Sequence, residues 1–286
     1  MLDPALATSD GERAAYREEI ERWRRERLDR LRSPDGWLSV VGLFWLEPGE
    51  NSVGTDPSNR IVVPGGRATD RLGTIALSED RALFTAAPGS DVRHAGAPVE
   101  TVELRSDAGG PPTVLTRGRV SFYLIRRSGR LAVRVKDTGS AARRGFRGIE
   151  SFPIEPGWRV EARFEPYDPP RELPIANVLG GVDGERCPGA IVFERAGATH
   201  SLDAIVETAE PDLFVIFGDE TNGVETYGAG RFLYAPRAAG GRTVLDFNKA
   251  YNPPCVFTPY ATCPLPPSQN RLPLRVEAGE KKYAGS

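Results

Sequence analysis

The 286-residue sequence has few of the residues that bind metals or act as nucleophiles, since it contains two histidines and three cysteines. Two histidines exclude a metal site built from several imidazoles, and a low, odd number of cysteines fits a reducing compartment. The G-x-S-x-G elbow, the Walker loop, the H-E-x-x-H motif and the zinc ribbon are also absent from the sequence. We therefore expect no cofactor and no bound metal.

The sequence also lacks an excess of charge and a long apolar run. Its net charge is -2 and its pI about 5.9, so we expect no nucleic-acid partner. No apolar run reaches the roughly 18 residues that a transmembrane helix needs. The first stretch, MLDPALATSDGERAAYREE, has no basic region followed by an apolar one, as a secretory signal would. We expect a cytoplasmic protein without membrane contact.

A helical pattern occupies residues 9–32. Ser9 and Glu12 have the spacing of a capping box. Apolar and long side chains follow a helical stripe through Tyr16, Ile20, Trp23, Arg27 and Leu31. Acidic residues are interleaved with the basic ones, which argues against a membrane-surface helix. The pattern predicts one amphipathic helix with one face laid on the protein body.

Short strands separated by turns follow, from the apolar run Trp37–Leu46 to about residue 137. Val120–Ile125 and Leu131–Lys136 flank the turn Arg127–Arg130, which indicates a hairpin. About seven short strands in this region are typical of a β-sandwich. Further strands begin with the alternating segment Trp158–Tyr167, which we expect Asp168-Pro169-Pro170 to end.

These patterns predict an all-β protein, a mainly antiparallel sandwich or barrel with one N-terminal amphipathic helix. No alternation of strands with long helices is present, so a parallel α/β sheet is not expected. We divide the chain into an N-terminal helix at 1–35, a β-sandwich at 36–137, and a second β-rich domain at 138–286 with a proline-rich C-terminal loop.

Turns in the first β region follow a particular order. Gly49–Thr55 precedes Asn59–Pro64, and Gly129–Leu131 closes a late hairpin. This order resembles a forkhead-associated domain, a family in which an arginine, a serine and an asparagine read phosphothreonine. Here Glu50 stands where the arginine should follow Gly49, and no Ser-x-x-His is present. The resemblance implies a shared sandwich without phosphopeptide binding.

Several motifs spread along the chain are those of one family. They are Trp37–Leu46, Gly49–Asn51, Phe217–Gly223, Thr226–Leu233, Asp246–Cys255, Ala261–Pro267, Asn270–Leu272 and Ala278–Lys281. With them the chain resembles a prokaryotic domain-of-unknown-function family, number 1684, over nearly its whole length. The cysteine-containing motif is the specific one. No activity is established for that family, so the resemblance implies no mechanism.

The segment Leu245–Lys282 is rich in proline, which fixes φ and removes backbone donors, so it cannot form regular structure. Apolar residues such as Phe257 and Leu265 give it a side that can dock on a core, which favours an ordered loop over a linker. An ordered loop that carries many polar side chains is a candidate functional site.

Cys255 and Cys263 lie in this loop, and three interpretations are open for them. They could share a metal, although no histidine is near in sequence. They could form a disulfide, against the expected compartment. They could be two buried structural thiols, the most common state of free cysteine. A nucleophilic Cys255 would need a lowered pKa, for which Lys249 or Arg271 could supply charge, and His200 is a candidate base.

Our first hypothesis is a pocket for an anionic small molecule in the C-terminal β domain, with walls from the Asp219–Arg231 hairpin and the Asp246–Arg271 loop. Its ligand-binding residues are Arg231, Tyr227, Asn248, Asn252, Asn270, Arg271 and Asp246. If the pocket is catalytic, we expect acid–base or hydrolytic chemistry with Lys249, Tyr251 or Cys255 nearest the reaction.

Two alternatives remain open. One is a protein-interaction module that uses the loops of the N-terminal sandwich, although the sequence does not point to a particular protein partner. The other is a purely architectural role for the C-terminal motif, as a buried hydrogen-bond network that pins the loop. In that case Arg231 would form a structural ion pair with Asp219, Glu225 or Asp246.

Overall fold

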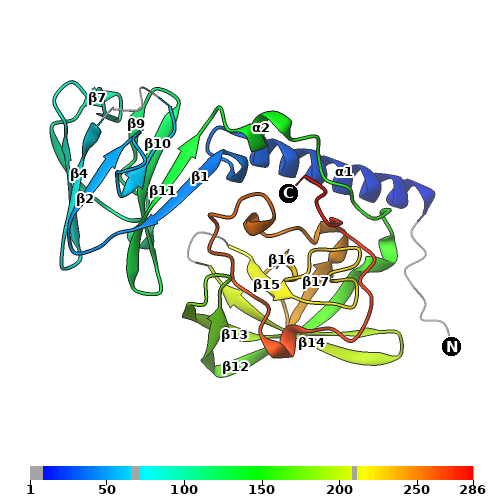
Figure 1. Cartoon of the computed structure of the whole chain (residues 1–286). Coiled ribbons are helices and arrows are strands. Elements are labelled where there is room, and N and C mark those ends of the chain that lie inside the picture. Colours follow the sequence, from blue (N-terminus) through cyan, green and yellow to red (C-terminus); the bar gives the residue numbers. More distant parts are fainter. Residues whose placement is uncertain (1–8, 66–70, 208–210, 286) are drawn as a thin grey trace. The chain divides into compact units, whose positions relative to one another are not determined.

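The structure is a computed structural model that describes residues 9–65, 71–207 and 211–285 (Figure 1). The contacts within the chain divide it into two compact units. Unit 1 comprises the described residues of Met1–Arg30, Arg147–Val256 and Thr262–Ser286, and unit 2 those of Leu31–Phe146 and Phe257–Ala261. Both are built mainly of antiparallel strands, which confirms the predicted all-β class with one long N-terminal helix.

Helix α1 (Asp10–Arg32) begins at the predicted capping box. The Ser9 amide donates to Glu12 Oε2 at 2.7 Å, and the Glu12 amide donates to Ser9 Oγ at 3.2 Å. Within unit 1 the helix buries Tyr16 and Ile20 together with Ile154. None of the helices in the described ranges has the length and apolar character needed to cross a membrane.

Unit 2 contains two sheets that share one core. One has the order β1 (Val40–Trp45), β11 (Arg130–Asp137), β10 (Val120–Arg127), β9 (Leu115–Arg117), β6 (Arg93–His94) and β7 (Ala97–Pro98). The other has the order β3 (Ile61–Val62), β2 (Gly49–Gly54), β4 (Arg71–Ser78), β5 (Arg81–Ala86) and β8 (Thr101–Leu104). Phe84 of one sheet meets Phe122 of the other edge-to-face at 5.9 Å between ring centroids, so the sheets pack as a sandwich.

The predicted hairpin between β10 and β11 is confirmed, with Arg127 paired to Arg130. Ser128 and Gly129 have φ of 47° and 74°, the left-handed pair that a two-residue hairpin turn requires. Short helices complete the unit: η1 (Trp37–Ser39), η2 (Asp107–Gly109) and α2 (Ala141–Gly145).

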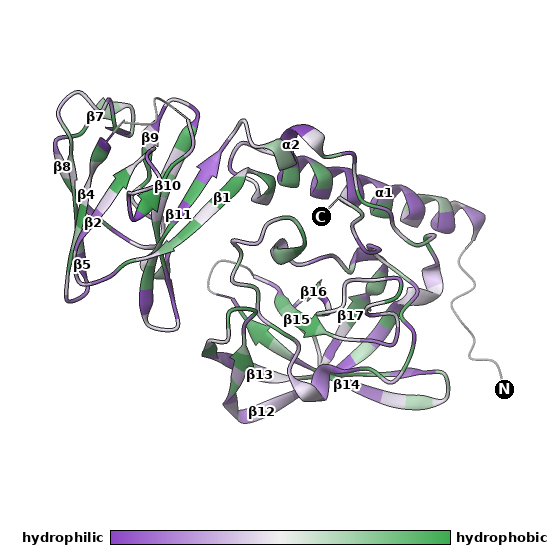
Figure 2. Cartoon of the chain, in the orientation of Figure 1, coloured by the Kyte–Doolittle hydropathy of each residue, from purple (hydrophilic) through white to green (hydrophobic). Residues whose placement is uncertain are grey.

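Unit 1 is organised by one six-stranded sheet. After η3 (Pro156–Trp158) its order is β16 (Arg231–Ala235), β15 (Leu213–Phe217), β14 (Ala198–Val206), β13 (Val182–Arg195), β12 (Arg159–Ala176) and β17 (Arg242–Asp246). Every residue of β15 is buried, and the strand is coloured as hydrophobic in Figure 2. Phe247 follows β17, and its ring centroid lies 5.7 Å from that of Phe193 and 5.5 Å from that of Phe217. Aromatic rings therefore fill the centre of this core.

The prediction that Asp168-Pro169-Pro170 ends its strand was wrong, because β12 continues to Ala176. Pro166 pairs with Gly189 and Arg171 pairs with Cys187, so the residues between them form a bulge without partners on β13. Pro169 and Pro170 cannot donate to the ladder, which explains a bulge rather than a break. The bulge brings Tyr167 and Arg171 to the same rim of the sheet.

The proline-rich segment Leu245–Lys282 is ordered, as predicted; its residues Phe257–Ala261 belong to unit 2 and the others to unit 1. After the end of β17 its helices are short 3-10 helices: η4 (Phe247–Lys249), η5 (Pro254–Val256) and η6 (Ser268–Asn270). The amides of Phe232 and Tyr251 each donate to the other's carbonyl at 2.9 Å, and the Leu272 amide donates to Gly218 O at 2.8 Å. Backbone hydrogen bonds to β16 and to the end of β15 therefore fix a segment that has no strand of its own.

Candidate functional site

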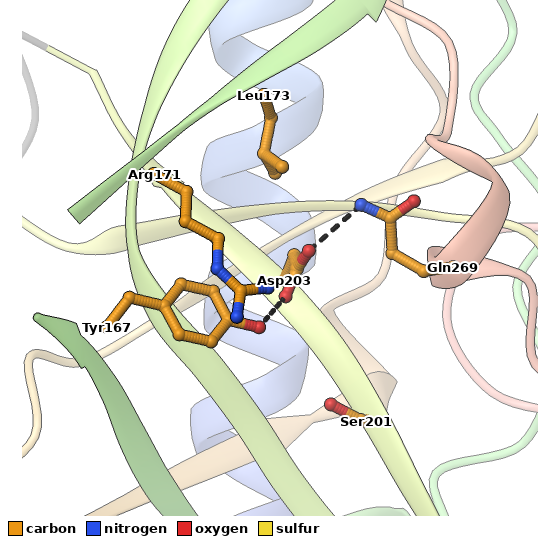
Figure 3. A pocket seen from close by; sticks show the side chains of 6 residues that line it. All are labelled: Tyr167, Arg171, Leu173, Ser201, Asp203 and Gln269. Carbon is orange, nitrogen blue, oxygen red and sulfur yellow. Dashed lines mark hydrogen bonds between the residues drawn. The ribbon is translucent and has the colours of Figure 1, made fainter. Parts of the chain in front are cut away.

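A hollow of about 320 Å³ opens on the surface of unit 1 beside the β12 bulge. Figure 3 shows the side chains that line it: Tyr167, Arg171, Leu173, Ser201, Asp203 and Gln269. The first three come from β12, Ser201 and Asp203 from β14, and Gln269 from η6. Ser201 and Asp203 are two residues apart on a strand, so they share one face of the sheet.

Asp203 is the fixed centre of this hollow. Its amide donates to Asn270 Oδ1 at 2.7 Å, and Asn270 Nδ2 donates to the Asp203 carbonyl at 2.8 Å. Its carboxylate accepts from the Tyr167 hydroxyl at 2.7 Å and from Gln269 Nε2 at 2.9 Å (Figure 3). The residue is 7% exposed. Two donors from separate elements thus hold a nearly buried negative charge.

Tyr167 and Arg171 form the rim above Asp203. Burial, followed by the hydrogen bond to Asp203, raises the pKa of Tyr167 to about 12, so its hydroxyl stays protonated and donates. The Arg171 guanidinium lies 3.7 Å from the centroid of the Tyr167 ring. Within the described residues this exposed guanidinium has no carboxylate in ion-pair contact. Arg171 is therefore a preorganised cation whose donors are available.

The predicted residues Lys249, Asp246 and Asn248 lie together elsewhere in unit 1, against α1. Lys249 Nζ lies 2.6 Å from Glu19 Oε1 and 4.0 Å from Asp246 Oδ2. Asp246 Oδ1 accepts from the Tyr16 hydroxyl at 2.8 Å, and burial raises the Asp246 pKa. Asn248 Nδ2 donates to that same hydroxyl at 2.9 Å. These contacts join the loop to the helix.

Tyr251 and Asn252 also face α1. The Arg27 guanidinium lies 4.7 Å from the centroid of the Tyr251 ring, and burial raises the pKa of that tyrosine. Arg27 Nε also lies 3.2 Å from Glu280 Oε1. Glu280 accepts from the Asn252 amide at 2.7 Å, and burial raises the Glu280 pKa. Asn252 Nδ2 donates to Lys281 O at 2.8 Å.

Arg231 is completely enclosed in unit 1. Its guanidinium pairs with Asp219 Oδ2 at 2.8 Å, and both side chains are 0% exposed. It also donates to the carbonyls of Val276, at 2.8 Å, and Ala278. This is the arrangement that the architectural alternative expects of Arg231, a structural ion pair that ties β16 to the C-terminal segment.

Cys255, Cys263 and Tyr227 form a third group. The Cys255 amide donates to Cys263 Sγ at 3.0 Å. Hydrogen bonds from the Cys263 thiol, the largest cause, and from the Tyr227 hydroxyl lower the pKa of Cys255 to about 7 despite its burial. His200, the candidate base, instead contacts Arg195 O at 3.3 Å and packs against Phe193.

The structure therefore spreads the predicted residues over several places. None of the predicted residues lines the hollow. Asn270 holds the backbone of Asp203, and Arg271 is exposed and forms a backbone bridge with Gly218. Sequence reasoning missed the residues of the rim, because it treated their prolines as the end of a strand. In the described ranges no group of three or more His, Cys, Asp or Glu side chains is placed to hold a metal ion.

The fold is that of a mainly antiparallel β-protein, and unit 1 carries a polar hollow beside the β12 bulge. The chain belongs to the family described as "Protein of unknown function (DUF1684)", whose profile matches residues 144–281. The match covers about half of the chain, so the prediction of nearly the whole length was too wide, and the motifs at Trp37–Leu46 and Gly49–Asn51 lie outside it.

Among solved structures, the chain is similar to an uncharacterized protein of Haloarcula marismortui determined by solution NMR. The two are 30% identical, the alignment covers 50% of this chain and 81% of that one, and the TM-score is 0.43. No curated protein matches the chain.

Proposed function

We propose that unit 1 binds a small anionic molecule in the hollow beside Asp203, with Arg171 as the residue that holds the negative group. The observation that carries the proposal is the Arg171 guanidinium on the Tyr167 ring at the mouth of the hollow, which has no ion-pair carboxylate among the described residues. A guanidinium presents a planar fork of donors that matches a carboxylate or a phosphate, and stacking on the ring reduces the ordering that binding requires.

The other lining groups define the remainder of the ligand. Ser201 offers a hydroxyl, and the Asp203 carboxylate, which already accepts from Tyr167 and Gln269, can accept one further donor. We therefore expect a ligand with an anionic group for Arg171 and a hydroxyl or amine for Asp203. A hollow of about 320 Å³ suits a small metabolite.

The proposal is for binding. Lys249 and Arg231 each face a carboxylate, Glu19 and Asp219 respectively, at 2.6 and 2.8 Å. These pairs support an architectural role for that part of the predicted pocket. In the hollow, the Ser201 side chain carries an aliphatic hydroxyl. The nearby Asp203 carboxylate accepts hydrogen bonds from Tyr167 and Gln269. The lining therefore does not pair the Ser201 hydroxyl, as a nucleophile, with the Asp203 carboxylate, as its base.

The test compares the native protein with Arg171→Met by titration calorimetry against a panel of hydroxylated carboxylates and phosphate esters. Arg163→Met is a matched control, because Arg163 also lies on β12 but already pairs with Glu165 at 3.3 Å. We expect Arg171→Met to weaken binding by at least about tenfold, the loss of one charge-assisted contact. Equal affinity of the two variants would rule out the proposed role of Arg171.

A second candidate function, protein interaction through unit 2, is favoured by a polar hollow of about 380 Å³ on that unit. Its lining comprises Ser52, Asp56, Ser58, Asn59 and Arg71. Asp56, Ser58 and Asn59 lie in the turn after β2, where binding residues of sandwiches commonly lie, while Ser52 lies on β2 and Arg71 on β4. A partner captured by the full chain and lost from a Ser58→Ala, Asn59→Ala variant with unchanged melting would support this function; equal capture would count against it.

A further inference from the structure

Neither Cys255 nor Cys263 takes part in a disulfide, and the two lie in contact although seven residues separate them. Pro254 opens η5 and directs the Cys255 amide to Cys263 Sγ at 3.0 Å. An amide nitrogen and the Sγ of the same cysteine are three bonds apart, so this contact also brings the two sulfurs together. A hydrogen bond from the Cys263 side chain is the largest of the causes that lower the pKa of Cys255.

The Tyr227 hydroxyl supplies a second donor to the Cys255 sulfur. It arrives from the loop between β15 and β16, outside the proline-rich segment that carries both cysteines. Burial and this contact raise the pKa of Tyr227, which keeps the hydroxyl protonated as a donor. Two donors aimed at one sulfur stabilise its thiolate, the nucleophilic form of cysteine.

The exposures of the cysteines differ in the way that a reactive pair requires. Cys255 is half-buried, whereas Cys263 is buried. The third cysteine, Cys187, is also buried, and its Sγ donates to Gly189 O at 3.4 Å. Burial raises the Cys187 pKa, so the chain carries its own unreactive reference thiol.

We propose that Cys255 and Cys263 form a peroxide-reactive thiol pair, in which Cys255 reacts first as the nucleophile, Cys263 resolves the product to a disulfide, and Tyr227 is a positioning residue. This site is independent of the proposed ligand hollow. It extends the disulfide interpretation of the sequence from a permanent bond to a reversible one.

The oxidant is a hydroperoxide, and the chemistry balances as follows. The Cys255 thiolate attacks one peroxide oxygen; a sulfur–oxygen bond forms, the oxygen–oxygen bond breaks, and the leaving hydroxide takes up the proton that Cys255 released, giving water. The Cys263 sulfur then attacks the sulfenic sulfur, which forms the disulfide and releases a second water. Two thiols lose two electrons and two protons, and a dithiol reductant reverses the change by thiol–disulfide exchange.

The experiment treats native full-length protein with equimolar hydrogen peroxide and maps thiols and disulfides by alkylation and peptide mass spectrometry. We expect one disulfide between Cys255 and Cys263 and an intact Cys187. The matched control, Cys187→Ser, should oxidise at the native rate. Cys263→Ser should instead accumulate a sulfenic acid on Cys255 that dimedone traps.

Tyr227→Phe tests the positioning role, because a merely structural tyrosine would not set the acidity of Cys255. We expect the midpoint of Cys255 alkylation to lie near pH 7 in the native protein and to rise in this variant. The peroxide reaction at pH 7 should then slow by about tenfold per unit of pKa. Retention of all three thiols by native protein, or oxidation of Cys187 as fast as Cys255, would overturn the pair. Should Cys263→Ser not fold, the native and Tyr227→Phe measurements still decide the question.

Discussion

Unit 1 holds two arginines that each lie beside a buried aspartate and over an aromatic ring, and they are partnered differently. Arg231 lies 5.4 Å from the centroid of the Phe217 ring, is 0% exposed and pairs with Asp219 at 2.8 Å. Arg171 lies 3.7 Å from the centroid of the Tyr167 ring and is exposed, while its neighbour Asp203 is satisfied by other donors.

The difference teaches where each charge acts. Burying two charges costs desolvation free energy, and their mutual attraction offsets this cost only while both partners are present. Loss of Arg231 should therefore destabilise the fold. An exposed guanidinium held on a ring has no such internal partner, and its donors can serve a ligand. The enclosed pair should dominate unfolding experiments, and the open arginine should dominate binding experiments.

The largest expected effect is that of Arg231→Met. It leaves Asp219 as an unpaired buried carboxylate and removes the bonds to the carbonyls of Val276 and Ala278. We expect a loss of about 3–5 kcal/mol in the free energy of unfolding, measured with urea. Arg242→Met, which removes an exposed arginine from β17, should cost less than about 1 kcal/mol. Equal losses would remove the distinction.

Asn270→Ala should have the next largest effect. Asn270 accepts from the Asp203 amide and donates to the carbonyls of Asp203 and Ile216, all in a buried setting. Its loss leaves three backbone groups unsatisfied, and we expect a cost of about 2–3 kcal/mol with weaker ligand binding, because Asp203 would no longer be fixed. Gln269→Ala, one residue earlier and exposed, should cost about 1 kcal/mol or less. Thermal melts of the two variants compare these losses.

Glu280→Gln should change the pH dependence of stability. Burial raises the pKa of Glu280 above its ordinary value of 4.5. Between these two pKa values the Glu280 carboxyl is protonated in the folded protein and ionised in the unfolded protein. This contribution is fully present below about pH 4.5, the ordinary value, and is lost as the pH rises through the folded pKa. The unfolding free energy of native protein minus that of Glu280→Gln should therefore grow as the pH falls from 7 to 5. A flat difference across urea titrations at several pH values would contradict the assignment.

Patterns of local sequence predicted the fold class well. The Ser9–Glu12 capping box and the Ser128-Gly129 turn are specified by a few neighbouring residues, and the structure has both. The continuation of β12 was missed because prolines stop a ladder locally, while pairing on both sides of the bulge can restore it.

The candidate site could be predicted much less well, because it depends on contacts between distant residues. Tyr167, Asp203 and Gln269 are far apart in sequence and meet only through strand pairing and the fixed C-terminal segment. Arg231 looked equally suited to a ligand and to a carboxylate, since burial, which decides between them, is a property of the folded chain. The contact between Cys255 and Cys263 likewise depends on the backbone conformation of η5, which orients the Cys255 amide.

The smallest expected effect on stability belongs to Arg171→Met. The variant keeps an apolar stem over Tyr167 and leaves no buried charge unpaired, so we expect the free energy of unfolding to change by less than about 1 kcal/mol. Paired with Arg231→Met in the same urea series, it separates the two arginines directly: one should lose stability, the other only affinity. A loss of several kcal/mol from Arg171→Met would mean that this guanidinium also serves the fold, and the contrast between the enclosed and the open arginine would fail.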